Sequence, residues 1–177
     1  TKRSRKNSER FNLGGESTIA QEISQEIGMD RLGIWKDPAF AKKYADNQEE
    51  LAPTLVNRSR VIDTVKRAIE GNVDFPKWIL SEGAGPSMLY SAYQNLEGLI
   101  DSNGFEMPQI VDRDNSIEML KHGKNPNRII GNMTGERSSL VEGSFDLVDN
   151  ASLHLLSSEE DIMNSLVEAN RVLRDGG

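Results

Sequence analysis

The sequence predicts an α/β fold in which a doubly wound, parallel β-sheet lies between helices, with further helices at the N-terminal side. Short apolar runs alternate along the chain with segments whose apolar residues repeat at helical spacing. One such run, residues 78–82, leads into Gly83-Ala84-Gly85 and then into a helical pattern. A strand, a Gly-X-Gly turn and a helix open nucleotide-binding α/β folds, because glycine lets a ligand approach the backbone. The alternative for this turn is that it only packs a helix onto a strand.

Composition limits the classes of protein that need to be considered. The chain has 177 residues, which suits one domain of ordinary size. It has no cysteine, so disulfides, thiolate metal sites and a cysteine nucleophile are excluded, and we expect no metal site. No apolar run approaches the roughly 20 residues of a membrane span, and no signal-peptide pattern is found. These features favour a cytoplasmic protein.

Charge divides the chain unevenly. Residues 1–10 carry five basic side chains and one acidic side chain, whereas the whole chain has a net charge of −7. We predict a basic, disordered tail over 1–16, a helical cap or lid over 17–76 and a ligand-binding core over 77–177. The acidic body argues against a nucleic-acid groove, and contact of the tail with RNA or an anionic surface is the remaining alternative.

Three helices are predicted before the first strand. Ser17–Gly28 has a stripe of isoleucines, a serine or threonine cap and a glycine stop. Asp37-Pro38 opens a second helix that carries Phe40, Ala41 and Tyr44. A third pattern runs over residues 48–69, with Pro53 in its first turn or at a break. Its predicted buried face consists of Leu51, Leu55, Ile62, Val65 and Ile69. A more specific interpretation makes residues 35–44 a lid over a ligand.

The second half of the chain repeats the strand and helix pattern. After the glycine turn, one helix is predicted to bury positions 89, 93, 96 and 100. A second strand is predicted at 109–111 and leads into the charged residues 112–114. Two further strands are predicted at 128–130 and 145–148. A last helix opens with Ser158 and Asp161 at capping-box spacing. It is predicted to bury Ile162, Leu166, Ala169 and Leu173.

Four stretches of this half resemble motifs of one known family. They are Ile79 to Ser87, Asp114 to Leu120, Gly143 to Val148 with His154 beyond it, and Asn170 to Gly177. In order and spacing they are similar to the class I S-adenosylmethionine-dependent methyltransferases, especially the small-molecule (type 11 and type 25-like) group. The resemblance implies a Rossmann-like sheet with strands one to four of a seven-stranded fold. It also implies a C-terminal truncation, so we expect a missing segment, or a partner chain, to cover the edge of the fourth strand.

The resemblance also assigns the residues of a cofactor site. Asp114 would accept hydrogen bonds from both ribose hydroxyls, although an aspartate there could also cap a helix. Asn132 and Met133 would lie beside the adenine, and the glycine turn would line the methionine part. The residues expected to bind S-adenosylmethionine are Tyr44, Glu82, Gly83, Ala84, Gly85, Asp114, Asn115, Asn132, Met133 and Asn150.

Three positions depart from the family pattern. Ser81 stands where the acid is usual, and Glu82 is adjacent to it. In a strand, a shift of one residue turns a side chain to the opposite face of the sheet. Ser87 replaces a third glycine, and Asn132 replaces an aspartate.

The implied reaction is in-line methyl transfer to a small-molecule acceptor. His154 is the candidate base, because a neutral imidazole can take a proton near neutral pH, although a histidine at this position could simply pack behind the strand. Residues 149–152 lack the Asn/Asp-Pro-Pro-aromatic motif of enzymes that methylate the amino groups of bases or glutamine. The lack of cysteine excludes the covalent route to pyrimidine C5.

Two rival classes remain open from the sequence. One is a nicotinamide-dependent oxidoreductase, which is disfavoured because Met88 stands where the dinucleotide fingerprint needs glycine. The other is a non-catalytic member of the fold that binds the cofactor or only a partner protein. Binding of NAD in preference to S-adenosylmethionine would support the first rival, and binding without methyl transfer would support the second.

Overall fold

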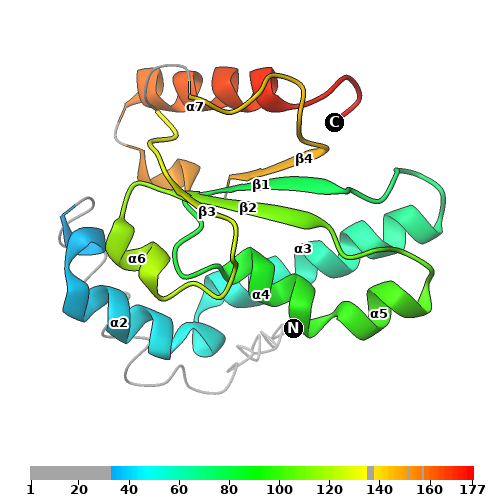
Figure 1. Ribbon diagram of the computed structural model, residues 1–177, viewed down its shortest axis with the longest axis horizontal. Coiled ribbons are helices and arrows are strands. Elements are labelled where there is room, and N and C mark those ends of the chain that lie inside the picture. The colour runs from blue at the N-terminus through cyan, green and yellow to red at the C-terminus, as the bar shows by residue number, and fades with distance from the viewer. Residues whose placement is uncertain (1–32, 135–137, 151, 157) are drawn as a thin grey trace, which may run out of the picture.

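A computed structural model describes residues 33–134, 138–150, 152–156 and 158–177 of the chain (Figure 1). The predicted basic tail over 1–16 and the predicted helix over 17–28 lie outside these described residues. So does part of the loop predicted between the third and fourth strands.

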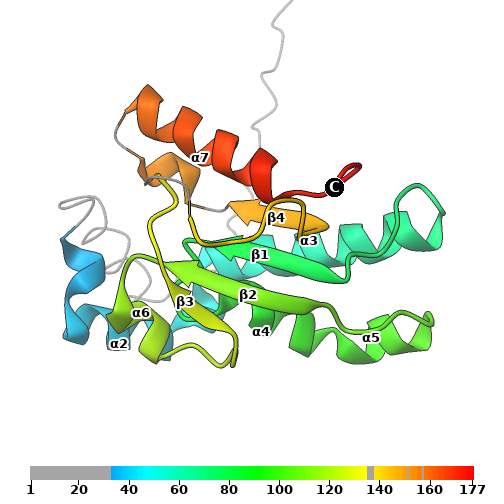
Figure 2. The same cartoon turned by 45° about the horizontal axis from the view of Figure 1, so that its top comes forward.

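The centre of the molecule is a four-stranded parallel sheet, as predicted. Its strands are β1 (Trp78–Glu82), β2 (Gln109–Asp114), β3 (Arg128–Ile130) and β4 (Leu147–Asn150), in the order β3-β2-β1-β4. In the register of β1 and β2, Glu82 lies opposite Arg113. Because the strands are parallel, their carboxyl ends meet at one edge of the sheet, and the arrowheads in Figure 2 point toward α2 and α6.

The fourth strand begins two residues later than the sequence predicted. Phe145 forms an isolated parallel bridge with Leu173, and the carboxylate of Asp146 accepts a hydrogen bond of 2.9 Å from the backbone nitrogen of Trp78. The ladder with β1 therefore starts at Leu147. Among the described strands, β4 lies at the edge of the sheet. The cover expected over that edge stays a prediction.

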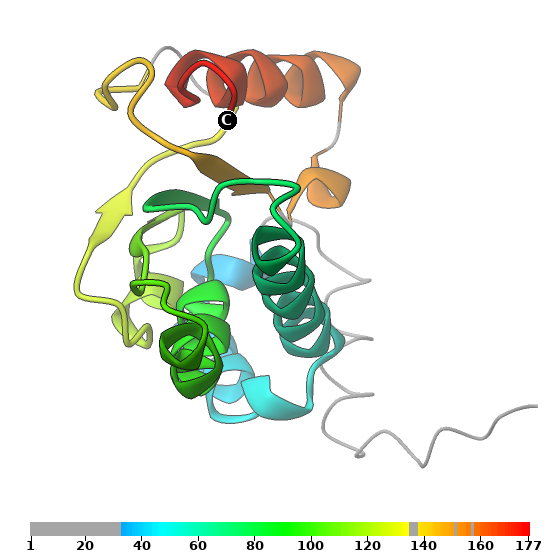
Figure 3. The ribbon, with the colours of Figure 1, turned by 90° about the vertical axis from the view of Figure 1, so that its right-hand side faces the viewer.

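One face of the sheet is covered by α3 (Ala52–Ile69), α4 (Met88–Asn95) and α5 (Glu97–Ser102), as Figure 3 shows. The single helix predicted up to position 100 breaks at Leu96. The predicted buried face of α3 is partly wrong, because Leu55, Ile62 and Ile69 are exposed. The helix instead turns Thr54, Asn57, Val61 and Val65 inward. The buried apolar cluster on this face consists of Val61, Val65, Ile79, Leu89, Ala92, Tyr93, Ile100 and Ile110.

The opposite face is covered by α7 (Glu159–Val172), which begins at the predicted cap, Ser158. The prediction that Leu166 is buried is wrong, since 45% of this residue is exposed. The buried residues of α7 are Ser165, Glu168 and Val172. The helix is rotated in this way because Ser165 accepts a bond from Asn150 of β4 and Glu168 lies 3.9 Å from Arg113 of β2.

Short elements gather at the carboxyl edge of the sheet. They are η1 (Ile34–Lys36), α2 (Pro38–Asp46), η2 (Gln48–Glu50), α6 (Ile117–Lys121) and η3 (Leu153–Leu155). The helix α2 starts as predicted, because the carboxylate of Asp37 accepts a hydrogen bond of 2.7 Å from the backbone nitrogen of Phe40. It packs on α6 and on η1 through a cluster that includes Phe40, Ala41 and Tyr44.

Candidate functional site

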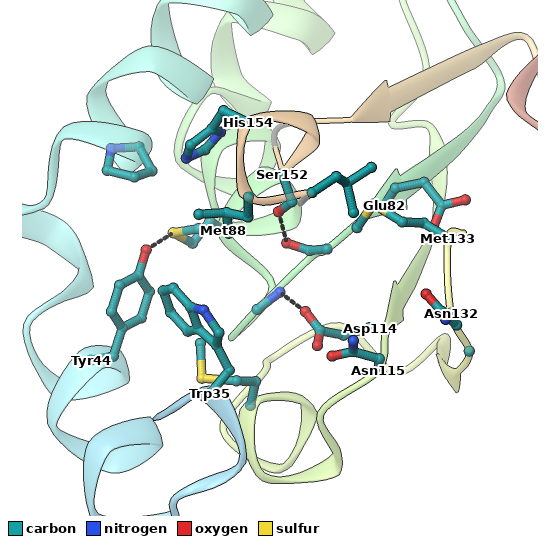
Figure 4. A pocket seen from close by; sticks show the side chains of 17 residues that line it. Trp35, Tyr44, Glu82, Met88, Asp114, Asn115, Asn132, Met133, Ser152 and His154 are labelled. Carbon is teal, nitrogen blue, oxygen red and sulfur yellow. Dashed lines mark hydrogen bonds between the residues drawn. The ribbon is translucent and has the colours of Figure 1, made fainter. Parts of the chain in front are cut away.

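A pocket of about 170 Å³ opens at the carboxyl ends of β1 and β2. This is where parallel α/β folds bind ligands, because the loops that follow neighbouring strands leave a crevice there. Figure 4 shows the side chains that line it. They are Trp35, Tyr44, Pro53, Glu82, Gly83, Gly85, Met88, Asp114, Asn115, Met119, Gly131, Asn132, Met133, Ser152, His154, Leu155 and Leu156.

The glycine turn forms the floor of this pocket and needs its glycines. Gly83 and Gly85 have φ angles of +62° and +55°, in the left-handed region that side chains rarely adopt. A Cβ on Gly83 would lie 2.2 Å from the hydroxyl oxygen of Ser152, which now donates a hydrogen bond of 3.3 Å to the Gly83 carbonyl. The turn therefore keeps bare backbone at the pocket and holds the start of η3 against it.

Asp114 and the glycine turn lie within hydrogen-bonding distance. The Oδ2 atom of Asp114 accepts a bond of 2.9 Å from the backbone nitrogen of Gly85 (Figure 4), and Oδ1 accepts one of 2.8 Å from the nitrogen of Ser116. Burial raises the pKa of this carboxyl group, and the bonds from Ser116 and Gly85 oppose that rise. Asp114 is not the cap of α6, because the Ser116 hydroxyl accepts the capping bond from Met119. An ionised carboxylate has about four lone-pair sites, so this oriented group can accept further bonds from a ligand.

One end of the pocket is apolar and aromatic. The hydroxyl of Tyr44 donates to the sulfur of Met88 at 3.7 Å, and burial, followed by the charge of Asp114, raises its pKa to about 12. The Trp35 ring meets the rings of Phe40 and Tyr44 edge-on, with centroids 5.4 Å apart in each pair. The hydroxyl of Ser116 donates to the carbonyl oxygen of Trp35, which ties this end to the cap of α6. Tyr44 is therefore neutral at physiological pH and fixed in place.

The turn after β3 brings two more predicted residues to the pocket. The amide oxygen of Asn132 accepts a bond of 3.1 Å from the nitrogen of Thr134, which leaves the amide nitrogen to serve as a donor. The terminal methyl group of Met133 approaches Gly83, at 3.1 Å from the position that a Cβ there would take. Asn115 lines the pocket from the end of β2 and is exposed.

Three predicted residues do not offer a polar side-chain group to the pocket. Glu82 lines it, but its carboxylate pairs with Arg113, whose Nε lies 2.7 Å from Oε2. Asn150 is outside the lining, and its amide nitrogen donates a bond of 2.7 Å to Ser165 on α7. Ala84 is buried, and its backbone nitrogen donates to the carbonyl of Arg113 at 3.2 Å.

His154 lines the pocket from η3 and is exposed, which leaves its ring accessible to a ligand and to solvent. Sequence reasoning missed several other lining residues. Trp35 belonged to the suspected lid, and Leu155 and Leu156 directly follow His154, so local sequence could have suggested them. Ser152 lies between the predicted residues Asn150 and His154, so local sequence could have suggested it too, whereas Pro53 carried no such signal, because it reaches the pocket through the packing of distant segments.

These groups fit an adenosyl ligand with an amino-acid tail. Bare backbone at the glycine turn, an oriented carboxylate, an amide donor and thioethers suit a main chain contact, ribose hydroxyls and a purine ring. Within the part of the chain that the structure describes, no group of three histidine, aspartate or glutamate side chains could hold a metal ion. In the same residues, no helix is both long and apolar enough to cross a membrane.

The fold is that of the class I S-adenosylmethionine-dependent methyltransferases. A solved structure with this fold comes from Methanococcus maripaludis and is described as a putative S-adenosyl-L-methionine-dependent methyltransferase. Its TM-score is 0.52 and its sequence identity is 15%, over 78% of the present chain and 59% of that one. The present chain thus spans about three fifths of the length of that protein. An identity this low establishes the fold alone.

Two further structures are less similar. A Pyrococcus horikoshii protein has a TM-score of 0.43 and 22% identity, over 68% of this chain and 51% of its own. A plantazolicin methyltransferase in complex with SAH has a TM-score of 0.45 and 14% identity, over 88% of this chain and 72% of its own. These scores are too low to add to the assignment. No protein-family model and no curated protein matches the sequence.

Proposed function

We propose that the protein binds S-adenosylmethionine and transfers its methyl group in line to a small-molecule acceptor. The observation that carries this proposal is the bond of 2.9 Å between the Asp114 carboxylate and the nitrogen of Gly85. It joins the ends of two parallel strands at one pocket, where the resemblance in the sequence requires an acid to face a glycine turn. The fold shared with the M. maripaludis structure supports the same proposal.

The proposed roles follow from the groups that each residue leaves available. Asp114 would accept bonds from the ribose hydroxyls, with Asn115 beside it. The amide nitrogen of Asn132 and the thioether of Met133 would contact the adenine. Backbone at Gly83 and Gly85 would contact the methionine part, and Tyr44 would close the apolar end.

When bound, S-adenosylmethionine supplies a methyl group that its sulfonium already activates, so the main task of the protein is positioning. The apolar side chains at Trp35 and Met88 would exclude water from this end of the pocket. An acceptor that loses a proton would give it to His154, whose exposed ring can pass it to solvent. His154 stays a candidate base, and acceptors that need none would not depend on it.

The first test is binding. Calorimetry should show that the protein binds S-adenosylmethionine and SAH, and does not bind NAD. Asp114→Asn keeps the shape of the side chain but removes its charge, and should weaken both ligands at least about tenfold, as expected for hydrogen bonds to a charged group. The matched control is Asp63→Asn on the exposed side of α3, which should leave both affinities unchanged. Tight binding of NAD without S-adenosylmethionine would overturn the proposal.

A specific observation favours the alternative of a non-catalytic, cofactor-binding protein. Two acidic residues line the pocket, but the carboxylate of Glu82 is paired with Arg113, which leaves Asp114 as the lining carboxylate that can contact a ligand. In this case calorimetry would show binding, but no acceptor would be methylated by the complete protein. Loss of methyl transfer in His154→Ala with unchanged binding would instead support the catalytic role.

We also propose that a further segment of the protein, or a partner chain, covers the outer edge of β4. The position of β4 at the edge of the described sheet supports this, because its outer backbone groups need partners. Exposed apolar side chains on the neighbouring α7 support it as well, namely Met163, Leu166 and Val167. The proposed location is the cytoplasm, because the chain has no cysteine with which to form the disulfides that are common in exported proteins.

A further inference from the structure

A buried cluster of charged residues lies between the sheet and α7, next to the pocket. It contains Glu82 from β1, Arg113 from β2, and Glu168 and Arg171 from α7, which are two carboxylates and two guanidinium groups. Arg113 is 1% exposed and Glu82 is 3% exposed. Arg113 donates to both carboxylate oxygens of Glu82, through Nε and Nη2. A buried guanidinium of this kind stays charged, so it needs a compensating carboxylate nearby.

Arg113 also contacts the two turns that line the pocket. Its carbonyl oxygen accepts the bond from the nitrogen of Ala84, in the middle of the glycine turn. Its side-chain stem lies under Gly131, where a Cβ would come within 2.9 Å of the Arg113 Cδ atom. Gly131 leads directly to Asn132 and Met133. Arg113 therefore contacts the glycine turn through its backbone and the turn that would contact the adenine through its side chain.

The ion pair of Glu82 and Arg113 also determines the charge at the pocket. Glu82 lies at the end of β1, but Figure 4 shows its carboxylate pointing away from Tyr44 and Trp35. Within the described part of the chain, the Nη1 atom of Arg113 has no hydrogen-bond partner and lies 3.9 Å from Glu168. Glu168 in turn bonds to Arg171 at 2.7 Å. The four charges of the cluster cancel. Of the two carboxylates that line the pocket, Asp114 is the one that has no cationic partner at hydrogen-bonding distance among the described residues.

We infer that Glu82 and Arg113 are a positioning pair of the cofactor pocket. The Arg113 side chain supports the turn at Gly131, its backbone carbonyl holds the glycine turn, and Glu82 cancels its charge, so that the attraction of the pocket for a sulfonium cation comes from Asp114. This inference rests on the proposed function, and it gives Glu82 a role that differs from direct contact with the ligand. It predicts that breaking the pair changes how the pocket distinguishes S-adenosylmethionine from SAH, which lacks the sulfonium charge.

The test is the ratio of the dissociation constants for S-adenosylmethionine and SAH, measured by calorimetry at pH 7.5 and low salt. Glu82→Gln leaves an uncompensated guanidinium beside the pocket, which repels the sulfonium but not the uncharged thioether of SAH. The ratio should rise roughly tenfold, since charges a few ångströms apart interact strongly where water is excluded. In Glu82→Gln/Arg113→Met both charges are absent, and the ratio should return to within about twofold of the wild type.

Two controls separate charge from structure. Glu82→Asp keeps the charge but shortens the side chain, so it should lower the melting temperature and leave the ratio unchanged. Arg171→Met removes the other guanidinium of the cluster, which is away from the pocket lining, and should also leave the ratio unchanged. Both variants are expected to be less stable than the wild type, which shows that the ratio does not simply follow stability.

Three outcomes would overturn the inference. In the first, Glu82→Gln weakens both ligands equally, which would make the pair merely structural. In the second, the ratio of the double variant departs from the wild-type value by more than about twofold, and this comparison does not need Glu82→Gln to fold. In the third, the wild type binds neither ligand, and the proposed function fails as well. In the first outcome the wild type still binds both ligands, so the inference fails and the proposed function stands.

Discussion

Within β1 and within β2, consecutive residues point to opposite faces of the sheet. The two faces bury different kinds of side chain. Under α3, α4 and α5, Ile79 joins a cluster of eight buried apolar residues. Under α7, Leu80 belongs to a smaller buried cluster with Phe145 and Val172, and the same face of the sheet also buries the ion pairs of Arg113 with Glu82 and Glu168. The first face is stabilised mainly by removing apolar surface from water, and the second depends on complete pairing of its charges.

The same contrast separates two adjacent charged residues of β2. Asp112 is fully buried on the apolar face, and neither of its carboxylate oxygens has a hydrogen bond of good geometry, although Ser87 and Asn125 lie close enough to offset part of its burial. Arg113 is buried on the α7 face against Glu82. Among the described residues, this sheet therefore buries one charged side chain with an ion-pair partner and another without one, at different costs in folding free energy. Four predictions test this contrast.

The largest effect is expected from shortening the two adjacent core residues. Ile79→Ala should lower the free energy of unfolding by about 3–5 kcal/mol, because it leaves a cavity in a closely packed cluster. Leu80→Ala should cost less, about 2–3 kcal/mol, because the smaller cluster under α7 can collapse around the gap. Urea denaturation measures both values. Equal losses, or a larger loss for Leu80→Ala, would contradict the contrast between the two faces.

The next effect is a pH-dependent gain in stability. Burial raises the pKa of Asp112 to about 6 from its usual 3.8, so ionisation of this group destabilises the folded state as the pH rises from about 4 to 6. Asp112→Asn removes the charge. The variant should therefore exceed the wild type by about 2–3 kcal/mol at pH 7 to 8 and match it below about pH 4. A set of denaturation curves over this pH range checks it, and a pH-independent difference would show that the charge is not the cause.

The charged face should respond to acid in the opposite sense. The bond from Arg171, assisted by Ser138, lowers the pKa of Glu168 to about 2 from its usual 4.5. Its ionised form therefore stabilises the fold above about pH 4.5, and this contribution is lost as the pH falls toward 2. Glu168→Gln should cost about 1–2 kcal/mol at pH 7, with allowance for partial screening by solvent, and the difference should shrink on acidification. A difference that grows below pH 4 would be inconsistent with this account.

The smallest effect is expected on the outer side of α7. Leu166 is 45% exposed, so Leu166→Ser should change the free energy of unfolding of this chain by less than about 0.5 kcal/mol. Buried Val172 on the same helix provides the matched comparison, and Val172→Ala should cost several times more. If Leu166→Ser is strongly destabilising, then this side of α7 is covered in solution.

Much of the fold could be predicted from the sequence because the strands are short, apolar and separated by clear helical patterns. The contact between Asp114 and Gly85 could also be predicted, since parallel strands bring their carboxyl ends together. The displacement of Glu82 by one position correctly indicated the opposite face of the sheet. Local rules were sufficient for these features.

The faces of the helices could not be predicted in the same way. Apolar spacing selected Leu55 and Ile62 for burial, whereas α3 turns Thr54 and Asn57 inward. In α7, Glu168 is buried beside Arg113, a residue distant in the sequence, and periodicity cannot detect such a contact. The pocket residue Pro53, in the first turn of α3, was missed for the same reason, since its position at the pocket depends on tertiary packing.

Ser87 stands where the family pattern has its third glycine, yet its φ angle is +63°, the shape that glycine would supply. A residue with a side chain pays about 1 kcal/mol or more for this conformation. Its hydroxyl oxygen also accepts a long bond, of 3.4 Å, from the nitrogen of Asn125. What is maintained at this bend is therefore the backbone conformation and not the residue type. A motif written as three glycines would pass over this chain, whereas one written in torsion angles would find it.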